Sequence, residues 1–269
     1  MSEAPMTPVD QRLKAESGDG VATITFNNPA KHNAVSLDMW QRMIALLEQY
    51  AADPSLRVLI VTGAGGKAFV SGADISKFES ERASEEAVAT YNSTSARVYD
   101  ALYNFPKPTI AKVRGYCIGG GVNLAVCCDL RIVSETAKFG IPAARLGLGY
   151  GFPGVDRLAE IVGISRAMEL FYTANRIDAA EARAMGLANG VVADADLDAH
   201  VSDLAARIAA NAPLTIQTIK AVAREIGKPS AQRDHAKLDR MVAACFASED
   251  YIEGRRAFME KRDPQFRGR

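Results

Sequence analysis

At two places in the chain, a short apolar, strand-like run leads directly into small residues. The first is Phe69-Val70-Ser71-Gly72-Ala73-Asp74-Ile75, and the second is Gly115-Tyr116-Cys117-Ile118-Gly119-Gly120-Gly121-Val122-Asn123-Leu124-Ala125. Small residues let the backbone approach a ligand closely. The second stretch also opens a helix-like segment, whose first N–H groups have no partner within the helix and favour negative charge. Both stretches are therefore candidates for a site built from backbone amides.

Each glycine-rich segment also has a simpler interpretation. Taken alone, the triple glycine at 119–121 is equally well explained as a tight strand-to-helix turn. Residues 63–68 fit the G-x-G-x-x-A pattern of a dinucleotide loop, but the residues that follow, 69–72, do not open a helix. The same loop lacks the Ser or Thr of a phosphate-binding Walker A motif, so a plain turn is the favoured interpretation. No G-x-S-x-G motif occurs, and a hydrolase triad has no support.

Composition excludes several classes of protein. The 269 residues suit one large domain, or one domain with a small appendage. The 32 basic and 32 acidic residues cancel, which argues against a nucleic-acid-binding protein. The four cysteines form no C-x-x-C motif and the three histidines are scattered, so we expect no metal site and reduced thiols. No signal peptide or membrane-length apolar run is visible, and we expect a cytoplasmic protein without membrane contact.

Hydrophobic patterning predicts an α/β core followed by helices. We expect strands at 21–26, 57–62, 109–113 and 130–133, and helices at 36–50 and 84–104. Asp178 and Glu181 form a capping-box pattern, and amphipathic helices are expected at 196–211, 213–226 and 233–246. The sequence thus predicts a core over residues 1–200 and a helical region over residues 201–269.

Four further polar side chains have structural interpretations. We interpret Asp129 as a polar cap between a helix and a strand, and Arg145 and Asp156 as loop-anchoring groups. Tyr150 lies between two glycines, which suits either a packing role or a phenol that donates a hydrogen bond or a proton.

These motifs, taken in order, resemble those of the crotonase superfamily, the enoyl-CoA hydratase/isomerase family, from about residue 20 to the C-terminus. The matching residues are Asn33-Ala34-Val35, Phe69-x-x-Gly72-Ala73-Asp74-Ile75, Lys107-Pro108, Gly115-Tyr116-x-x-Gly119-Gly120-Gly121, Leu124-Ala125-x-x-Cys128-Asp129, Lys138-Phe139-Gly140-x-Pro142, Arg157-Leu158, Gly163, Ala180, Met185-Gly186-Leu187-Ala188 and Phe258-x-x-Lys261-Arg262.

The resemblance implies a spiral of ββα repeats followed by a helical trimerisation region, assembled as a homotrimer or hexamer. It implies an acyl-CoA thioester substrate, with CoA as part of the substrate and no separate cofactor. It assigns an oxyanion hole, which stabilises the enolate of a thioester, to the amides of Ala73 and Gly120. The CoA contacts that it implies are Lys31, His32, Ser71, Asp74, Ile75, Ser76, Phe258 and Lys261, the last two reaching a neighbouring subunit's ligand.

The chain departs from the family pattern at both catalytic carboxylates. Hydratases of this family carry one glutamate two residues after the triple glycine and another directly after the proline at 142. This chain has Asn123 and Ala143 there. Neither side chain exchanges a proton at neutral pH, and a positioned acid or base contributes about 10²–10⁴-fold to a rate. The sequence therefore predicts slow hydration of crotonyl-CoA by a protein whose enolate-stabilising residues are intact.

Three alternatives remain open. Leu146-Gly147-Leu148-Gly149-Tyr150 resembles the stretch that carries the active-site tyrosine of methylmalonyl-CoA decarboxylase in the same superfamily, which makes Tyr150 a candidate proton donor and Asn123 a candidate orienting group. The missing glutamates also fit a catalytically silent CoA-binding or scaffold protein. A nucleotide-dependent oxidoreductase is supported only by the weak loop at 63–68.

Overall fold

The chain is built around two sheets, and along much of the chain successive strands alternate between them. The computed structural model describes residues 8–74 and 84–269. A six-stranded sheet has the order β1-β2-β3-β5-β7-β10, and a four-stranded sheet has the order β4-β6-β8-β9. The strands are β1 (Leu13–Gly18), β2 (Val21–Phe26), β3 (Val58–Gly63), β4 (Ala68–Val70), β5 (Thr109–Val113), β6 (Tyr116–Ile118), β7 (Leu130–Ser134), β8 (Lys138–Gly140), β9 (Arg176–Asp178) and β10 (Gly190–Val192).

The path of the chain is a spiral of ββα repeats, as expected. In three successive turns, β3 and β4, β5 and β6, and β7 and β8 each give their first strand to the large sheet and their second to the small one. A helix follows each pair along the chain: α4 (Glu85–Tyr103), α5 (Gly120–Cys127) and α6 (Phe152–Val162). These strands pair in parallel within each sheet, so their carboxyl ends lie at the same edge. The spiral therefore places the turns after β4 and β6 at the same edge of the small sheet.

Strand β3 shows why this arrangement suits the sequence. Val58 and Ile60 pack with α9 (Leu197–Ala209) on one face of the large sheet, whereas Leu59 and Val61 belong to the main core on the other face. Helix α2 (Leu37–Ala52) contributes to that main core. A strand buried on both faces reads as a continuous apolar run, which is the pattern in the sequence. The boundary predicted between residues 200 and 201 falls inside α9, a helix that packs on the sheet of the core.

The remaining helices are α1 (Val9–Arg12), α7 (Ile164–Thr173), α8 (Ala179–Ala184), α10 (Pro213–Ile226), α11 (His235–Ala247) and α12 (Glu249–Glu260). Of these, α10 and α11 lie where the sequence predicted helices, and α8 begins at the predicted capping box. The capping box of α8 is formed, because the Glu181 amide donates to the Asp178 carboxylate and the Asp178 amide donates to the Glu181 carboxylate, both at 2.9 Å. In the described residues, no helix is both long enough and apolar enough to cross a membrane.

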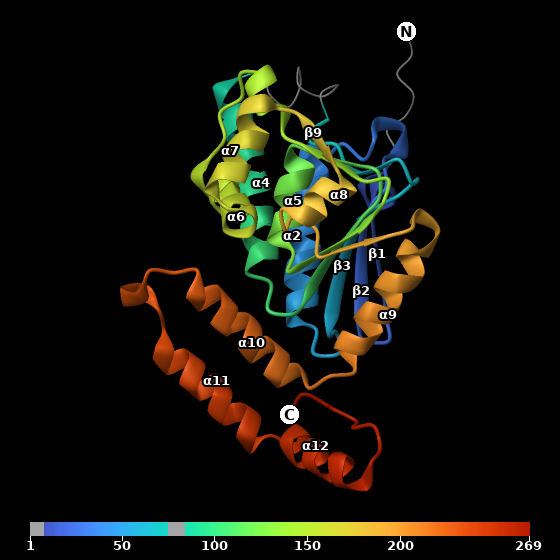
Figure 1. The fold of residues 1–269 in the computed structure, drawn as a ribbon, viewed down its shortest axis with the longest axis vertical. Helices are drawn as coiled ribbons and strands as arrows, with labels where there is room; N and C mark the ends of the chain where they lie inside the picture. Colours follow the sequence, from blue (N-terminus) through green and yellow to red (C-terminus); the bar gives the residue numbers. More distant parts are fainter. Residues whose placement is uncertain (1–7, 75–83) are drawn as a thin grey trace.

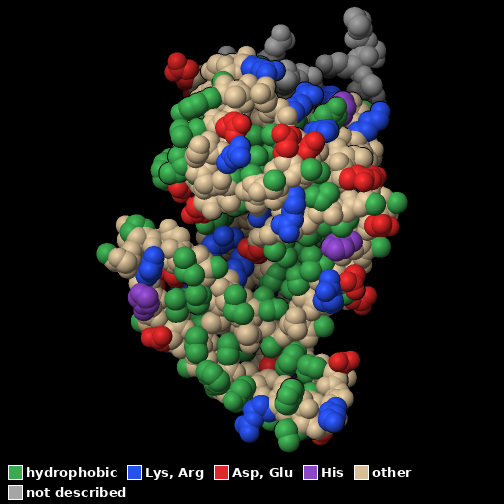
Figure 2. Space-filling model, viewed as in Figure 1, with side chains coloured by type: hydrophobic (Ala, Val, Ile, Leu, Met, Phe, Trp, Pro, Cys, Tyr) green, Lys and Arg blue, Asp and Glu red, His purple; other side chains and the backbone are tan. Residues whose placement is uncertain are grey.

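Residues 213–269, here called the C-terminal arm, project from the spiral body. Figure 1 shows α10, α11 and α12 extending away from the sheets. None of the residues of α11 is buried, and Figure 2 shows hydrophobic side chains gathered over the arm. The exposed apolar side chains of the arm include Ile219, Ile226, Val242, Phe246, Ile252, Phe258 and Met259. The arm therefore presents apolar surface that the rest of the described chain does not cover.

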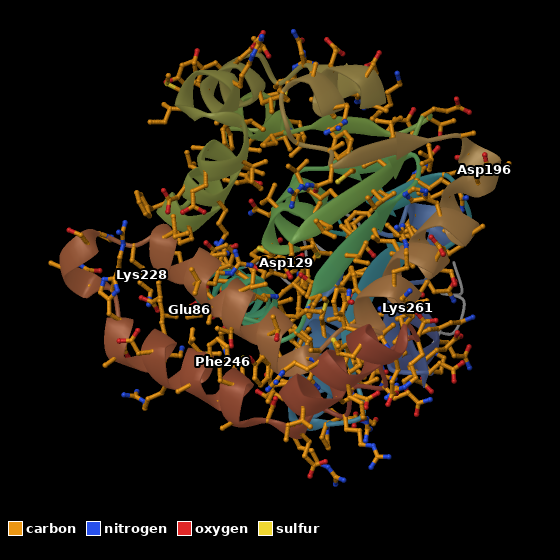
Figure 3. The ribbon with its side chains drawn as sticks, turned by 60° about the horizontal axis from the view of Figure 1, so that its bottom comes forward. Glu86, Asp129, Asp196, Lys228, Phe246 and Lys261 are labelled. Carbon is orange, nitrogen blue, oxygen red and sulfur yellow. The ribbon has the colours of Figure 1, made fainter. Side chains whose placement is uncertain are left out.

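Asp129 fastens the arm to the body (Figure 3). Its carboxylate accepts hydrogen bonds from the Thr109 amide at 2.8 Å, from Lys220 Nζ at 2.7 Å and from Arg224 Nη2 at 2.9 Å. Lys220 and Arg224 lie on α10, whereas Thr109 begins β5. Arg224 also lies over the ring of Tyr103, 3.8 Å from its centroid. Asp129 thus joins the helix–strand junction that the sequence indicated to the first helix of the arm.

Candidate active site

The triple glycine connects β6 to α5, and Gly119 and Gly121 each meet a steric requirement there. Gly119 has φ 55° and ψ −111°, a combination that side chains disfavour, and its amide donates to the Gly140 carbonyl at 2.8 Å. A Cβ atom on Gly121 would lie 2.0 Å from the carbonyl oxygen of Val70, so any other residue would push β4 away. Gly120 is the first residue of α5, and its amide has no partner within the helix.

The segment after β4 is held against Val35. The Val35 amide donates to the Gly72 carbonyl at 2.9 Å, and the Asp74 amide donates to the Val35 carbonyl at 3.0 Å. These two bonds form a parallel bridge between Val35 and Ala73. In such a bridge the central residue directs its own N–H to the side opposite its partner. The Ala73 amide therefore points away from Val35.

The two glycine-containing segments are in contact. A Cβ atom on Gly120 would lie 3.6 Å from Cα of Gly72, and a Cβ atom on Gly72 would lie 3.8 Å from the Gly120 nitrogen. Within residues 8–74 and 84–269, neither the Ala73 amide nor the Gly120 amide donates to a backbone carbonyl. Two unpaired backbone donors thus lie close together, which sequence spacing alone did not indicate.

Asn123 and Tyr150 lie beside this contact. Asn123 is three residues after Gly120 on α5, which places both on the same side of the helix. A Cβ atom on Gly154 of α6 would lie 3.0 Å from Asn123 Oδ1 and 3.0 Å from Tyr150 Cε1. The Tyr150 hydroxyl donates to the Gly119 carbonyl at 3.3 Å. The structure therefore brings together Asn123, which stands at one of the missing glutamate positions, and Tyr150, the candidate proton donor.

The environment of Tyr150 keeps its phenol protonated. Burial raises the pKa of Tyr150 well above its usual value near 10, and the nearby thiols of Cys117 and Cys127 act in the same direction. The ring packs edge-on against Phe171, with centroids 4.8 Å apart. Tyr150 is therefore a hydrogen-bond donor at neutral pH, and it also fills the packing role that its glycine neighbours suggested.

Ala143 offers no replacement for the second glutamate. It is buried in a 3-10 turn, Pro142–Arg145, that follows β8. The ring of Pro142 lies 4.0 Å from the position that a Cβ atom on Gly119 would occupy. In the described part of the chain, no cluster of three or more His, Cys, Asp or Glu residues is arranged to hold a metal ion.

Four of the predicted CoA-binding residues form one cluster next to Ala73. Lys31 Nζ lies 2.9 Å from Asp74 Oδ2, and the Asp74 side chain is buried while that of Lys31 is exposed. The Ser71 amide donates to the His32 carbonyl at 3.2 Å, and the Ser71 hydroxyl donates to the Lys31 carbonyl at 3.4 Å. These contacts join the 3-10 turn at 29–31 to the segment after β4. Ile75 and Ser76, which were also predicted, lie outside the described residues.

Phe258 and Lys261 lie apart from this cluster. Phe258 is on α12 with 82% of its surface exposed, and Lys261 follows the end of that helix. Figure 1 shows α12 at the far end of the arm, and Figure 3 labels Lys261 there. Of the twelve predicted positions, eight lie at or beside one site, and Phe258 and Lys261 lie apart from it. The other two, Ile75 and Ser76, are not among the described residues.

Sequence reasoning missed three residues that surround the site, Trp40, Tyr91 and Tyr99. The Tyr99 hydroxyl lies 3.4 Å from the Gly120 carbonyl, to which it donates. Tyr91 donates to the Val35 carbonyl at 2.9 Å. Tyr91 and Tyr99 are eight residues apart on α4, a spacing that places both on one face of the helix. That spacing was visible in the sequence, but nothing in it indicated which segments the face would contact.

Similarity to known proteins agrees with this geometry. The family model for enoyl-CoA hydratase/isomerase matches residues 16–269. The crotonyl-CoA hydratase of Syntrophomonas wolfei is 36% identical, with 95% of this chain and 98% of that protein covered. The 2,3-dehydroadipyl-CoA hydratase of Escherichia coli is 34% identical, with 93% and 96% covered.

Solved structures give the same result. An enoyl-CoA hydratase/carnithine racemase from Magnetospirillum magneticum superposes with a TM-score of 0.91 at 36% identity, covering 96% of each chain. An enoyl-CoA hydratase from Bacillus anthracis superposes with a TM-score of 0.90 at 31% identity, covering 96% of this chain and all of that one. The chain therefore belongs to the enoyl-CoA hydratase/isomerase family of the crotonase superfamily.

Proposed function

We propose that the protein is an enzyme that acts on acyl-CoA thioesters through an enolate held by the amides of Ala73 and Gly120. The observation that carries this proposal is the contact between Gly72 and Gly120, beside which both amides lack a backbone acceptor in the described residues. Negative charge that develops on a thioester oxygen is stabilised by donors arranged in advance of the reaction. The names of the relatives, which include hydratases of crotonyl-CoA and dehydroadipyl-CoA, support the same class of substrate.

The proposal assigns CoA to the cluster formed by Lys31, His32, Ser71 and Asp74, with Ile75 and Ser76 continuing the same segment. Lys31 supplies positive charge for a phosphate, and Asp74 orients it through their ion pair. CoA enters as part of the substrate, and no separate cofactor is proposed. Four cysteines without a disulfide are consistent with the cytoplasmic location that we predict.

Binding of acetoacetyl-CoA, measured by calorimetry, tests this proposal. We expect saturable binding with a stoichiometry of one thioester per chain. An absence of binding at millimolar ligand would defeat the proposal. Turnover of any thioester in a panel that contains crotonyl-, malonyl- and methylmalonyl-CoA would remove the alternative of a catalytically silent scaffold. Binding of NAD(P) is not expected, because the loop at 63–68 leads into β4 and not into a helix.

Decarboxylation is a candidate reaction besides the hydration typical of the family. The position of Tyr150 beside Gly119 favours it. In this reaction the bond between Cα and the substrate carboxylate breaks, CO₂ leaves, and the electron pair enters the enolate. The enolate carbon then takes a proton from an acid, and the thioester carbonyl forms again. No base is needed, which suits a site with Asn123 and Ala143 at the usual glutamate positions. Tyr150 is protonated and adjacent to Gly119, so it is our candidate for the acid, and Asn123 for the group that orients the carboxylate.

Replacing Tyr150 by phenylalanine tests that assignment. We expect Tyr150→Phe to lower the decarboxylation rate of malonyl- or methylmalonyl-CoA by about 10²-fold, because a positioned acid is lost, with little change in CoA affinity. We also expect no loss of rate from pH 6 to about 9 through ionisation of this phenol, because burial raises its pKa. Tyr172→Phe, at a tyrosine with 75% exposure, is the matched control. An unchanged decarboxylation rate in the Tyr150→Phe variant would show that Tyr150 has only a packing role.

We further propose that the C-terminal arm joins copies of this chain into a trimer, alone or paired as a hexamer. The exposed apolar side chains of the arm support this proposal, because monomers rarely leave such surface uncovered. In a trimer, Phe258 and Lys261 of one subunit are positioned to reach the thioester of its neighbour, which explains their separation from the site of their own chain.

Light scattering during size-exclusion chromatography measures this assembly. We expect a mass of about three or six times 28.8 kDa. Phe246→Arg, which adds charge to a side chain with 62% exposure, is expected to shift the population to monomer. Ala199→Arg, on the exposed side of α9, is the control for an added charge. A wild-type mass of one chain contradicts the proposed assembly.

A further inference from the structure

The two amides of the proposed oxyanion hole belong to segments that meet at Gly72 and Gly120. Gly72 and Gly120 lack side chains, so their contact does not lock the two segments by interdigitation. Hydrogen-bond donors act on a developing oxyanion only when they are held at about 2.7–3.1 Å from it. The pairing of β4 with β6 places the two segments side by side, and we look to further contacts for the finer placement of the two amides.

A chain of contacts connects the segment that carries Ala73 to the core. Val35 holds the segment through its bonds to Gly72 and Asp74, and the Val35 carbonyl also accepts the Tyr91 hydroxyl at 2.9 Å. The Tyr91 hydroxyl in turn accepts the indole N–H of Trp40 at 2.9 Å. A single carbonyl thus ties the Ala73 segment to both α2 and α4.

The same chain of contacts connects the core to the segment that carries Gly120. The Trp40 ring packs edge-on against the Tyr99 ring, with centroids 5.4 Å apart and planes at 70°. The Tyr99 hydroxyl donates to the Gly120 carbonyl at 3.4 Å, and it lies 3.0 Å from the position that a Cβ atom on Gly120 would occupy. The contacts therefore close a ring that starts at Gly72 and returns to it through Gly120.

Burial makes this ring of contacts rigid. Trp40 is 1% exposed and Tyr91 is 5% exposed, and Phe26 packs edge-on against Trp40 at 6.1 Å. Hydrogen bonds in such surroundings are strong, and leaving one partner unpaired is costly. The three aromatic side chains are thus held by helices α2 and α4 in one arrangement.

We propose that Trp40, Tyr91 and Tyr99, here called the aromatic brace, are positioning residues that set the separation and direction of the Ala73 and Gly120 amides. This inference rests on the proposed function. The brace acts on Ala73 through Val35 and on Gly120 through its carbonyl. It touches no reacting atom, and its effect is on how strongly the two amides polarise the thioester carbonyl.

A chromophoric thioester reads that polarisation directly. The absorption of dimethylaminocinnamoyl-CoA moves to longer wavelength when its carbonyl oxygen is polarised. Tyr91→Phe and Tyr99→Phe each remove one hydroxyl and keep the ring. We expect each variant to lose a large part of the shift seen with the wild-type protein and to lower turnover about tenfold, with a much smaller loss of affinity for free CoA, because the oxyanion donors need closer placement than the CoA cluster.

Tyr50→Phe is the matched control. Tyr50 is buried on α2, ten residues after Trp40 and about 15 Å from it along the helix. We expect this variant to keep the full spectral shift. Thermal unfolding of all three variants separates a loss of folding from a loss of polarisation, and Tyr99, which is less buried than Tyr91, keeps the test informative if Tyr91→Phe is unstable.

The outcomes separate the brace from the function on which it rests. A wild-type protein that binds no CoA thioester refutes the proposed function. A wild-type protein that binds and shifts the chromophore, together with Tyr91→Phe and Tyr99→Phe variants that keep the whole shift, overturns the brace alone. Loss of CoA affinity in the same proportion as the shift also overturns it, because that result indicates a general structural role.

Discussion

Replacing Ala73 by proline is expected to lower turnover of the protein's best acyl-CoA substrate by about 10²–10³-fold, the usual contribution of one oxyanion-hole donor. Proline has no N–H. The bridge to Val35 uses the Gly72 carbonyl and the Asp74 amide, so the substitution leaves both of its hydrogen bonds in place. We expect the affinity for free CoA to stay within a few-fold of the wild-type value, which separates loss of the donor from loss of the binding site. Steady-state kinetics and calorimetry measure the two quantities.

Ala180→Pro is the control for this substitution. Ala180 is exposed in the first turn of α8, where the helix makes no use of the amide and proline is tolerated. We expect it to keep wild-type kinetics. If Ala73→Pro has the same turnover as this control, the amide of residue 73 takes no part in the reaction.

Installing glutamates at residues 123 and 143 together is expected to raise crotonyl-CoA hydration by about 10²-fold or more, because each supplies a positioned acid or base. Gly154 packs closely against Asn123, since a Cβ atom there would lie 3.0 Å from the Asn123 amide oxygen, so the longer glutamate at residue 123 must settle beside it. Ala143 is buried, so the second glutamate needs adjustment of the 3-10 turn around it. We therefore expect the double variant to fall short of the full contribution of two carboxylates. The hydration assay follows the loss of the conjugated thioester absorbance.

Glutamines at both positions provide the control. Asn123→Gln combined with Ala143→Gln matches the size of the two glutamates but exchanges no proton, and we expect no gain in hydration. An equal gain from glutamines would assign the effect to shape. A wild-type protein that already hydrates crotonyl-CoA as fast as the hydratases of its family would show that Asn123 and Ala143 are no obstacle to that reaction.

Local sequence patterns predicted the regular elements well. The helix expected over 213–226 is α10 with the same bounds, and the capping box at Asp178 opens α8. The strand expected over 109–113 is β5. Each of these signals depends on neighbouring residues alone: a proline suited to a first helical turn, reciprocal side-chain caps, and an apolar run.

Such local signals could not predict the shortest strands or the placement of segments that are distant in the sequence. Strands β8 and β9 are three residues each, too short for a periodic pattern, and they are stabilised by pairing with each other. The projection of the arm depends on where Asp129 meets Lys220, residues separated by 91 positions. No local pattern specifies which distant partner a charged side chain will find.

Some residues of the candidate site could likewise be predicted from the sequence, and others could not. The glycines at 72 and 119–121 were identifiable because each position requires a small residue, and the structure gives the steric reason for it. The Lys31 cluster next to Ala73 was expected only from the family resemblance. The aromatic brace was not expected, because it depends on which face of α4 meets α2 and on a carbonyl of Val35 that no sequence pattern marks.

A crystal structure of the protein with bound acetoacetyl-CoA tests the central claim most directly. The account predicts one thioester carbonyl oxygen within about 2.7–3.1 Å of both the Ala73 and the Gly120 nitrogens. A bound thioester whose carbonyl oxygen lies away from these two amides, or that meets only one of them, would contradict it.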